Sequence, residues 1–122
     1  MVDIAASRAA VADALQMILD SNVHVYPAPP ERPAFPAVIL TEADAEFITP
    51  AETYGQFEIQ WKALVVAAPS TSNTVMTAAA DLLVSTLLTN LGSLRPQVDT
   101  YAVATLAGQN YLTAQLTLTH TT

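Results

Sequence analysis

The run from Tyr54 to Ala68 constrains the fold most, because it is the longest strand-like stretch in the chain. Its first half sets apolar Phe57, Ile59 and Trp61 between polar residues with a period of two, which is typical of a strand with one buried face. From Ala63 onward both faces are apolar, so this second half needs cover on both faces. At ~3.3 Å per residue, about twelve residues of this run span ~40 Å, which means that the strand crosses the whole domain, bends, or projects from it.

Two amphipathic stretches predict helices, at Asp3–Asp20 and at Ser72–Asn90. Asp3 is suited to cap the first helix, because its carboxylate can accept backbone N–H groups and its charge complements the helix dipole. The second helix is apolar over most of its circumference, so we expect more than one neighbour to bury it. Its predicted central stripe is Val75, Ala79, Leu82, Leu83 and Leu87, widened by Met76, Ala80, Val84, Leu88 and Leu91. Gly92 is expected to end this helix as a left-handed residue.

Shorter apolar runs predict four further strands, at Val23–Tyr26, Ala37–Leu40, Val98–Leu106 and Tyr111–His120. Between the first two, Pro27–Pro36 is rich in proline and is expected to be a stiff extended connector. Between the last two, Ala107–Asn110 is expected to close a hairpin. The alternation in the last strand predicts that one face only is buried, that of Leu112, Ala114, Leu116 and Leu118.

The predicted order is therefore helix, three strands, helix, two strands, in one α+β domain over residues 1–122. We expect a mostly antiparallel sheet, with a mixed sheet as the alternative, and two helices packed on one of its faces. A loop of twelve residues, Glu42–Thr53, connects the strand Ala37–Leu40 to the long strand. Such a loop is long for a compact domain, so we expect it to have a function of its own.

Charge and composition exclude several classes of function. Four Lys and Arg against eleven Asp and Glu give a net charge of −7, and the four cations are scattered, which is a poor composition for binding nucleic acid. There is no cysteine for disulfides or thiolate chemistry. No apolar run approaches the ~18 residues of a membrane span. Only 12% of the residues are charged, which suggests an apolar surface that subunit contacts cover.

No combination of residues predicts catalysis, a metal ion or a cofactor. The two histidines, His24 and His120, do not form a ligand-spaced pair, and we interpret them as a strand-end and a tail histidine. No serine has the context of an acyl-transfer nucleophile. Three glycines are too few for a phosphate-binding loop. Trp61 is interpreted as a core residue whose N–H needs a partner if it is buried. We therefore expect a protein that is not an enzyme.

The acidic loop has two interpretations. Its carboxylates, which could bind a hard cation, are Glu42, Asp44, Glu46 and Glu52. Their spacing is not that of an EF-hand, and the loop lacks the glycine of that motif. A solvated loop that contacts a partner is the favoured interpretation.

The succession of elements is similar to that of a known family. It consists of VHVY at residues 23–26, the proline-rich connector, PAVIL at residues 36–40, TYGQFEIQWKALVVA at residues 53–67, the helix that follows, and YLTAQLTLT at residues 111–119. In this order the chain resembles the tail terminator, or tail completion, proteins of long-tailed bacteriophages. The resemblance covers most of the chain, and it lies in the order of the elements, with no catalytic signature.

The resemblance implies a virion protein of the head–tail junction that is assembled in the host cytoplasm. Proteins of this family form a ring, usually a hexamer, that caps the tail tube, stops its polymerisation and joins the tail to the neck. The partners implied are further copies of the chain, the tail tube protein and a head-completion or neck protein. The genome passes through the ring without specific binding, and the family has no catalytic residues.

A ring needs two different contact patches on each subunit, and excess apolar surface is where we expect them. The candidate subunit contacts are Leu64, Val66, Met76, Val84 and Leu88. The acidic loop is expected to line the channel or to contact the tube.

Two alternatives stay open. The first is a head-closure or head–tail adaptor ring of the neck, which belongs to the same class. The second is a small oligomeric α+β enzyme or ligand-binding protein with a site between subunits, for which His24, Tyr26 and Glu58 are the plausible polar groups.

Overall fold

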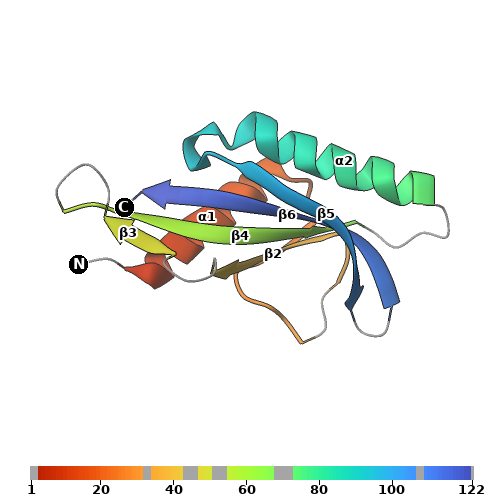
Figure 1. Ribbon diagram of the computed structural model, residues 1–122, viewed down its shortest axis with the longest axis horizontal. Coiled ribbons are helices and arrows are strands. Elements are labelled where there is room, and N and C mark those ends of the chain that lie inside the picture. Colours follow the sequence, from red (N-terminus) through yellow and green to blue (C-terminus); the bar gives the residue numbers. More distant parts are fainter. Residues whose placement is uncertain are drawn as a thin grey trace.

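The computed structural model describes residues 3–31, 34–42, 47–50, 55–67, 73–106 and 109–121. Its architecture is α+β, which confirms the predicted class and the predicted order of the main elements (Figure 1). In chain order the elements are α1 (Ile4–Ile18), β1 (His24–Tyr26), β2 (Ala37–Glu42), β3 (Ile48–Pro50), β4 (Phe57–Val66), α2 (Asn73–Asn90), the 3-10 turn η1 (Gly92–Leu94), β5 (Gln97–Leu106) and β6 (Gln109–Thr121).

The six strands form one sheet in the order β1-β2-β4-β6-β5, and β3 pairs with the beginning of β4. Every pairing is antiparallel except the short parallel pairing of β1 with β2, so the sheet is mixed, as the predicted alternative allowed. The long strand β4 is central. It pairs with β2 over its second half and with β6 over most of its length.

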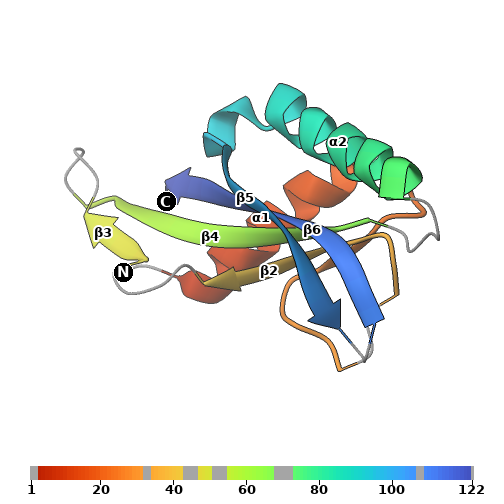
Figure 2. The same cartoon turned by 45° about the vertical axis from the view of Figure 1, so that its right-hand side comes forward.

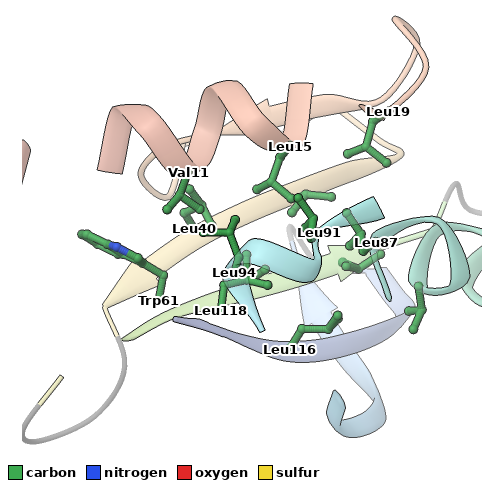
Figure 3. Packing of buried hydrophobic residues seen from close by; sticks show 14 of the residues in the cluster. Val11, Leu15, Leu19, Leu40, Trp61, Leu87, Leu91, Leu94, Leu116 and Leu118 are labelled. Carbon is green, nitrogen blue, oxygen red and sulfur yellow. The ribbon is translucent and has the colours of Figure 1, made fainter. Parts of the chain in front are cut away.

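Both helices pack on the same face of the sheet, as predicted. Alternate residues of β4, from Ile59 to Val65, join residues of β2 and β6 in one apolar cluster with the two helices. Figure 3 shows Val11 and Leu15 of α1 and Leu87 of α2 pointing toward the strands that carry Leu40 and Leu116. The core of the subunit therefore lies between this face and the helices.

The first helix follows its sequence pattern closely. The Oδ1 atom of Asp3 accepts the N–H of Ala6 at 3.0 Å, so Asp3 is the N-cap that the sequence predicts. Its buried residues, Ser7, Val11 and Leu15, are spaced by four and form the stripe that faces the sheet.

The second helix has its predicted bounds but not its predicted orientation. Val75 and Leu82, which we placed on the central buried stripe, are 56% and 69% exposed. Of the central stripe only Leu87 is buried, and the other buried positions, Ala80, Val84 and Leu91, are ones that we placed at its margin. The physical reason is that a helix apolar on nearly every side carries no contrast that fixes its rotation about its own axis.

The chain itself covers the second face of β4. Val66 is fully buried, and so is Ala37, which lies opposite it on β2. The ring of Phe35, from the proline-rich connector, packs on that of Tyr111 with centroids 4.4 Å apart. The described parts of the connector, orange in Figure 2, lie on the other side of the sheet from α2. Two-sided burial at this end of the sheet therefore needs no second subunit.

The same packing corrects the expectation for the last strand. Tyr111 and Thr113 are buried although they lie on the face that we expected to be solvated. One-sided burial was wrong at this end of β6, because the side chains there lie under the connector.

Three turns also differ from expectation. The acidic loop contains the short strand β3, whose Ile48 pairs with Ile59. Gly92 begins a 3-10 turn, and the left-handed residue is Arg95, with φ of 46°. The hairpin is tighter than predicted, because Gln109 already pairs with Leu106. Its two linking residues, 107 and 108, lie outside the described residues.

Candidate interaction surface

The five predicted subunit contacts differ in their exposure to solvent. Val66 and Val84 are buried inside the subunit, at 0% and 4% exposure, so naming them as subunit contacts was wrong: neither side chain is accessible to a neighbour. Leu64 and Met76 are half-buried, and Leu88 is exposed. Of the five residues, Leu88 is thus the one whose side chain is most available for contact.

The acidic loop is described only in part. Glu42 ends β2 and forms an ion pair with Arg8. Asp44, Glu46 and Glu52 lie outside the described residues, so their role in a channel lining or a tube contact stays a prediction.

Two sides of α2 carry exposed apolar residues, and of these residues the sequence pattern named only Leu88 as a contact. Val75 and Leu82, seven residues apart, lie on one side of the helix, which we call the outer stripe of α2. Asp81 and Leu88, also seven apart, lie on a different side. Because Val75, Leu82 and Leu88 are as apolar as the buried residues of the helix, only the packing of the helix distinguishes them.

The side of α2 that carries Asp81 continues onto strand β5. The carboxylate of Asp81 accepts a hydrogen bond from the hydroxyl of Tyr101. Val103 lies two residues further along β5, on the same face of the strand as Tyr101, and is 68% exposed. We call this area the α2–β5 surface, and define it by Asp81, Leu88, Tyr101 and Val103. Beside it lies an open depression of about 420 Å³ lined by Thr74, Thr77, Ala78 and Asp81.

Partial burial raises the pKa of Tyr101 above its ordinary value of 10.0, and the nearby charge of Asp81 raises it further. Both effects disfavour the phenolate. Because the pKa of Tyr101 is higher in the folded than in the unfolded state, protonated Tyr101 contributes to the stability of the fold. This contribution is complete below about pH 10 and is lost as the pH rises through the pKa of the folded state.

Asp81→Asn is expected to lower the pKa of Tyr101 toward its ordinary value, because a neutral amide replaces the carboxylate that opposes ionisation. Spectrophotometric titration of the tyrosines, with Tyr101→Phe to identify the signal of this residue, measures the change. The same substitution at exposed Asp13 of α1 serves as the control. An unchanged Tyr101 titration in Asp81→Asn would contradict the contact.

A buried polar cluster lies on the other side of the core. The indole Nε1–H of Trp61 donates to the Oγ atom of Ser7 at 3.0 Å, and Oγ lies 2.7 Å from Nδ1 of His120. Ser7 is only 1% exposed, so no substrate reaches its hydroxyl, and the pair of Ser7 and His120 is structural. We expected His120 to be a free tail residue, and this was wrong, because its contact with Ser7 joins β6 to α1.

Basic residues near this cluster are engaged locally. The guanidinium carbon of Arg8 lies 5.1 Å from the centre of the Trp61 ring, in cation–π contact, while Arg8 also pairs with Glu42. Nη2 of Arg95 lies 2.9 Å from Oε1 of Glu58. Both guanidinium groups therefore have carboxylate partners within the subunit.

The groups of the ligand-site alternative do not converge within a subunit. His24 and Tyr26 lie on β1, beside the part of β2 that pairs with Leu64–Val66. Glu58 is six to eight positions further along β4, which corresponds to ~20 Å or more. The depression of about 420 Å³ is lined by residues of α2 instead.

The described part of the chain was searched for metal-binding groups of side chains and for membrane-spanning helices, and neither is found there. Within those ranges no three His, Cys, Asp or Glu side chains are grouped so that they could hold a metal ion. The described helices include none that is both long and apolar enough to cross a membrane.

No protein-family model matches the chain, and no curated protein matches its sequence.

Proposed function

We propose that this protein is a tail terminator: a structural, non-enzymatic subunit of a ring that caps a bacteriophage tail tube and joins it to the neck. The sequence resemblance over most of the chain supports the proposal, as does the agreement between the resembling segments and consecutive elements of the fold. The ring would consist of further copies of the chain, with the tube protein and a neck protein as its partners.

The observation that carries the proposal is the outer stripe of α2. Val75 and Leu82 are large apolar side chains that are more than half exposed, on a helix whose single charged residue is Asp81. Exposed apolar surface on one side of a helix is typical of a contact with another protein. In a ring, each subunit offers such a patch to a different patch on its neighbour, which makes the contact heterologous. We therefore assign the outer stripe to one side of the subunit contact, in place of Val66 and Val84.

The charge of the chain is consistent with this role. A net charge of −7 on each subunit disfavours binding of DNA phosphates. A ring through which a genome moves needs a channel surface that does not bind the DNA. The ion pairs of Arg8 and Arg95 reduce the exposed positive charge further.

The experiment is electron microscopy and light scattering of the purified chain, alone and mixed with tail tubes. We expect rings of one rotational symmetry, either free or at tube ends. Leu82→Glu should abolish them, because it places a charge in the apolar contact. Gln60→Glu introduces the same side chain at an exposed position of β4 and should leave the rings intact.

The outcomes separate the alternatives. Rings that bind no tube but complete heads would indicate a neck adaptor instead. A chain that stays monomeric both alone and with tubes would refute the ring. Rings that persist unchanged in Leu82→Glu would refute the assigned contact.

A further inference from the structure

We infer that the free edge of β5 binds an extended, basic segment of another protein, which adds to the sheet as a further strand. This partner is distinct from the neighbouring copies of the proposed ring, and its site does not include the outer stripe of α2. Three features of the α2–β5 surface support the inference: an open sheet edge, exposed apolar side chains next to it, and charge of one sign.

The first feature is the edge itself. Among the described residues β5 pairs with β6 alone, so its other side is the edge of the sheet. Natural edge strands are usually protected by lysine, proline, a bulge or a short length. β5 is ten residues long and has neither lysine nor proline. Its one protective feature is a bulge between Val98 and Thr100, where Asp99 accepts a hydrogen bond from Thr117 at 2.5 Å. Beyond the bulge, the pairing of β5 with β6 is regular up to Leu106.

The second feature is the apolar surface beside this regular part. Tyr101 and Val103 are 47% and 68% exposed and lie on the face of β5 that turns toward the helices. A strand added next to β5 would place its own alternate side chains beside these two residues. The depression beside Asp81 could accommodate one longer side chain of that strand.

The third feature is charge, and it identifies the kind of partner. α2 and β5 together contain two charged residues, Asp81 and Asp99, and no Lys or Arg. β5 of a second copy has no Lys or Arg that could meet Asp81, and its one charged residue, Asp99, has the same sign of charge. A strand with Lys or Arg placed to meet Asp81 would have complementary charge. We therefore assign the edge to a different protein with alternating apolar and basic residues.

The test uses the full chain and a synthetic peptide. The peptide is capped at both ends, is about eight residues long to match the free part of β5, and alternates valine with threonine except for one central lysine. Its fluorescence anisotropy measures binding, and hydrogen exchange of the chain locates it. We expect slower exchange in residues 100–106. We also expect about fivefold tighter binding than for the same peptide with glutamate in place of lysine, since the charge that faces Asp81 changes sign.

Matched variants test the location and the charge. Val103→Lys should weaken binding of the lysine peptide about tenfold, because it places like charge and a hydrated side chain on the edge. Leu82→Lys puts the same side chain at a position of almost equal exposure on the outer stripe, and should leave peptide binding unchanged. Asp81→Asn should remove the preference for lysine over glutamate.

Three results would overturn the inference. One is the absence of any protection of residues 100–106 at millimolar peptide. Another is equal binding of the lysine and glutamate peptides. The third is self-association of the chain that Val103→Lys abolishes, because the occupant of the edge would then be a second copy. If Leu82→Lys loses the rings but still binds the peptide, the inference stands, because Leu82 belongs to the proposed ring contact and not to the edge of β5.

Discussion

Val66→Glu is expected to prevent folding of the subunit, and any loss of association should follow from that. Val66 is fully buried between β2 and β6, on the face of the sheet that lies under the connector. A carboxylate there has no partner and no water, and an unpaired buried charge costs several kcal/mol, commonly more than ~3. Domains of this kind are stable by only ~5–15 kcal/mol in total. Circular dichroism and urea unfolding measure the effect.

The control for this substitution is Leu88→Glu, which introduces the same side chain at a position that is 43% exposed. It should change the free energy of unfolding by less than about 1 kcal/mol, as substitutions at exposed positions usually do. If Val66→Glu folded as well as Leu88→Glu, the burial of β4 on both faces within one subunit would be wrong. A neighbouring subunit would then be the cover for this strand after all.

Ser7→Ala is expected to destabilise the fold by about 1–3 kcal/mol, although it removes only one oxygen atom. The Oγ atom of Ser7 is the hydrogen-bond partner of both Trp61 and His120. Trp61 is fully buried, so its N–H would be left without a partner and without water. The midpoint of urea denaturation, followed by the fluorescence of this single tryptophan, measures the loss.

Two variants isolate the hydrogen bonds from other effects of the substitution. Ser85→Ala makes the same change on the exposed side of α2 and should be neutral or slightly stabilising, because alanine favours helix. In a Trp61→Phe background there is no indole N–H that Ser7→Ala could leave without a partner. The loss of unfolding free energy caused by Ser7→Ala should therefore be smaller in this background. An equal cost in both backgrounds would mean that the Ser7–Trp61 bond contributes little.

Periodicity was sufficient to predict those parts of the fold in which apolar and polar residues alternate clearly. The half of β4 around Trp61 and the helix capped by Asp3 are of this kind, and both are confirmed. Periodicity failed where the contrast is missing. Leu82 and Val84 are equally apolar, yet one is exposed and the other is buried.

Contacts between distant parts of the chain were not predictable from spacing. At the end of the sheet where Val66 is buried, the ring of Phe35 packs on that of Tyr111, and these two residues are far apart in the sequence. Ser7 and His120 are 113 positions apart, and neither is unusual in its local context. The need of Trp61 for a polar partner was foreseeable, but the identity of that partner depends on where α1 crosses the sheet.

The candidate contact residues were chosen because they are apolar, and apolarity alone does not separate a core from an interface. This explains why Val66 and Val84 were selected wrongly and Leu82 was missed. The useful distinction is exposure after folding, which gives the outer stripe of α2 and the α2–β5 surface.

The position of β6 in the sheet also determines when the subunit can form. This strand, the last in the chain, lies between β4 and β5 and pairs with both of them. Until residues 109–121 have been synthesised, β4 and β5 each lack a neighbour and the core lacks Leu116 and Leu118. Such pairing between distant segments slows folding. The sheet therefore closes only after these residues have been made, and assembly of the subunit should follow the synthesis of β6.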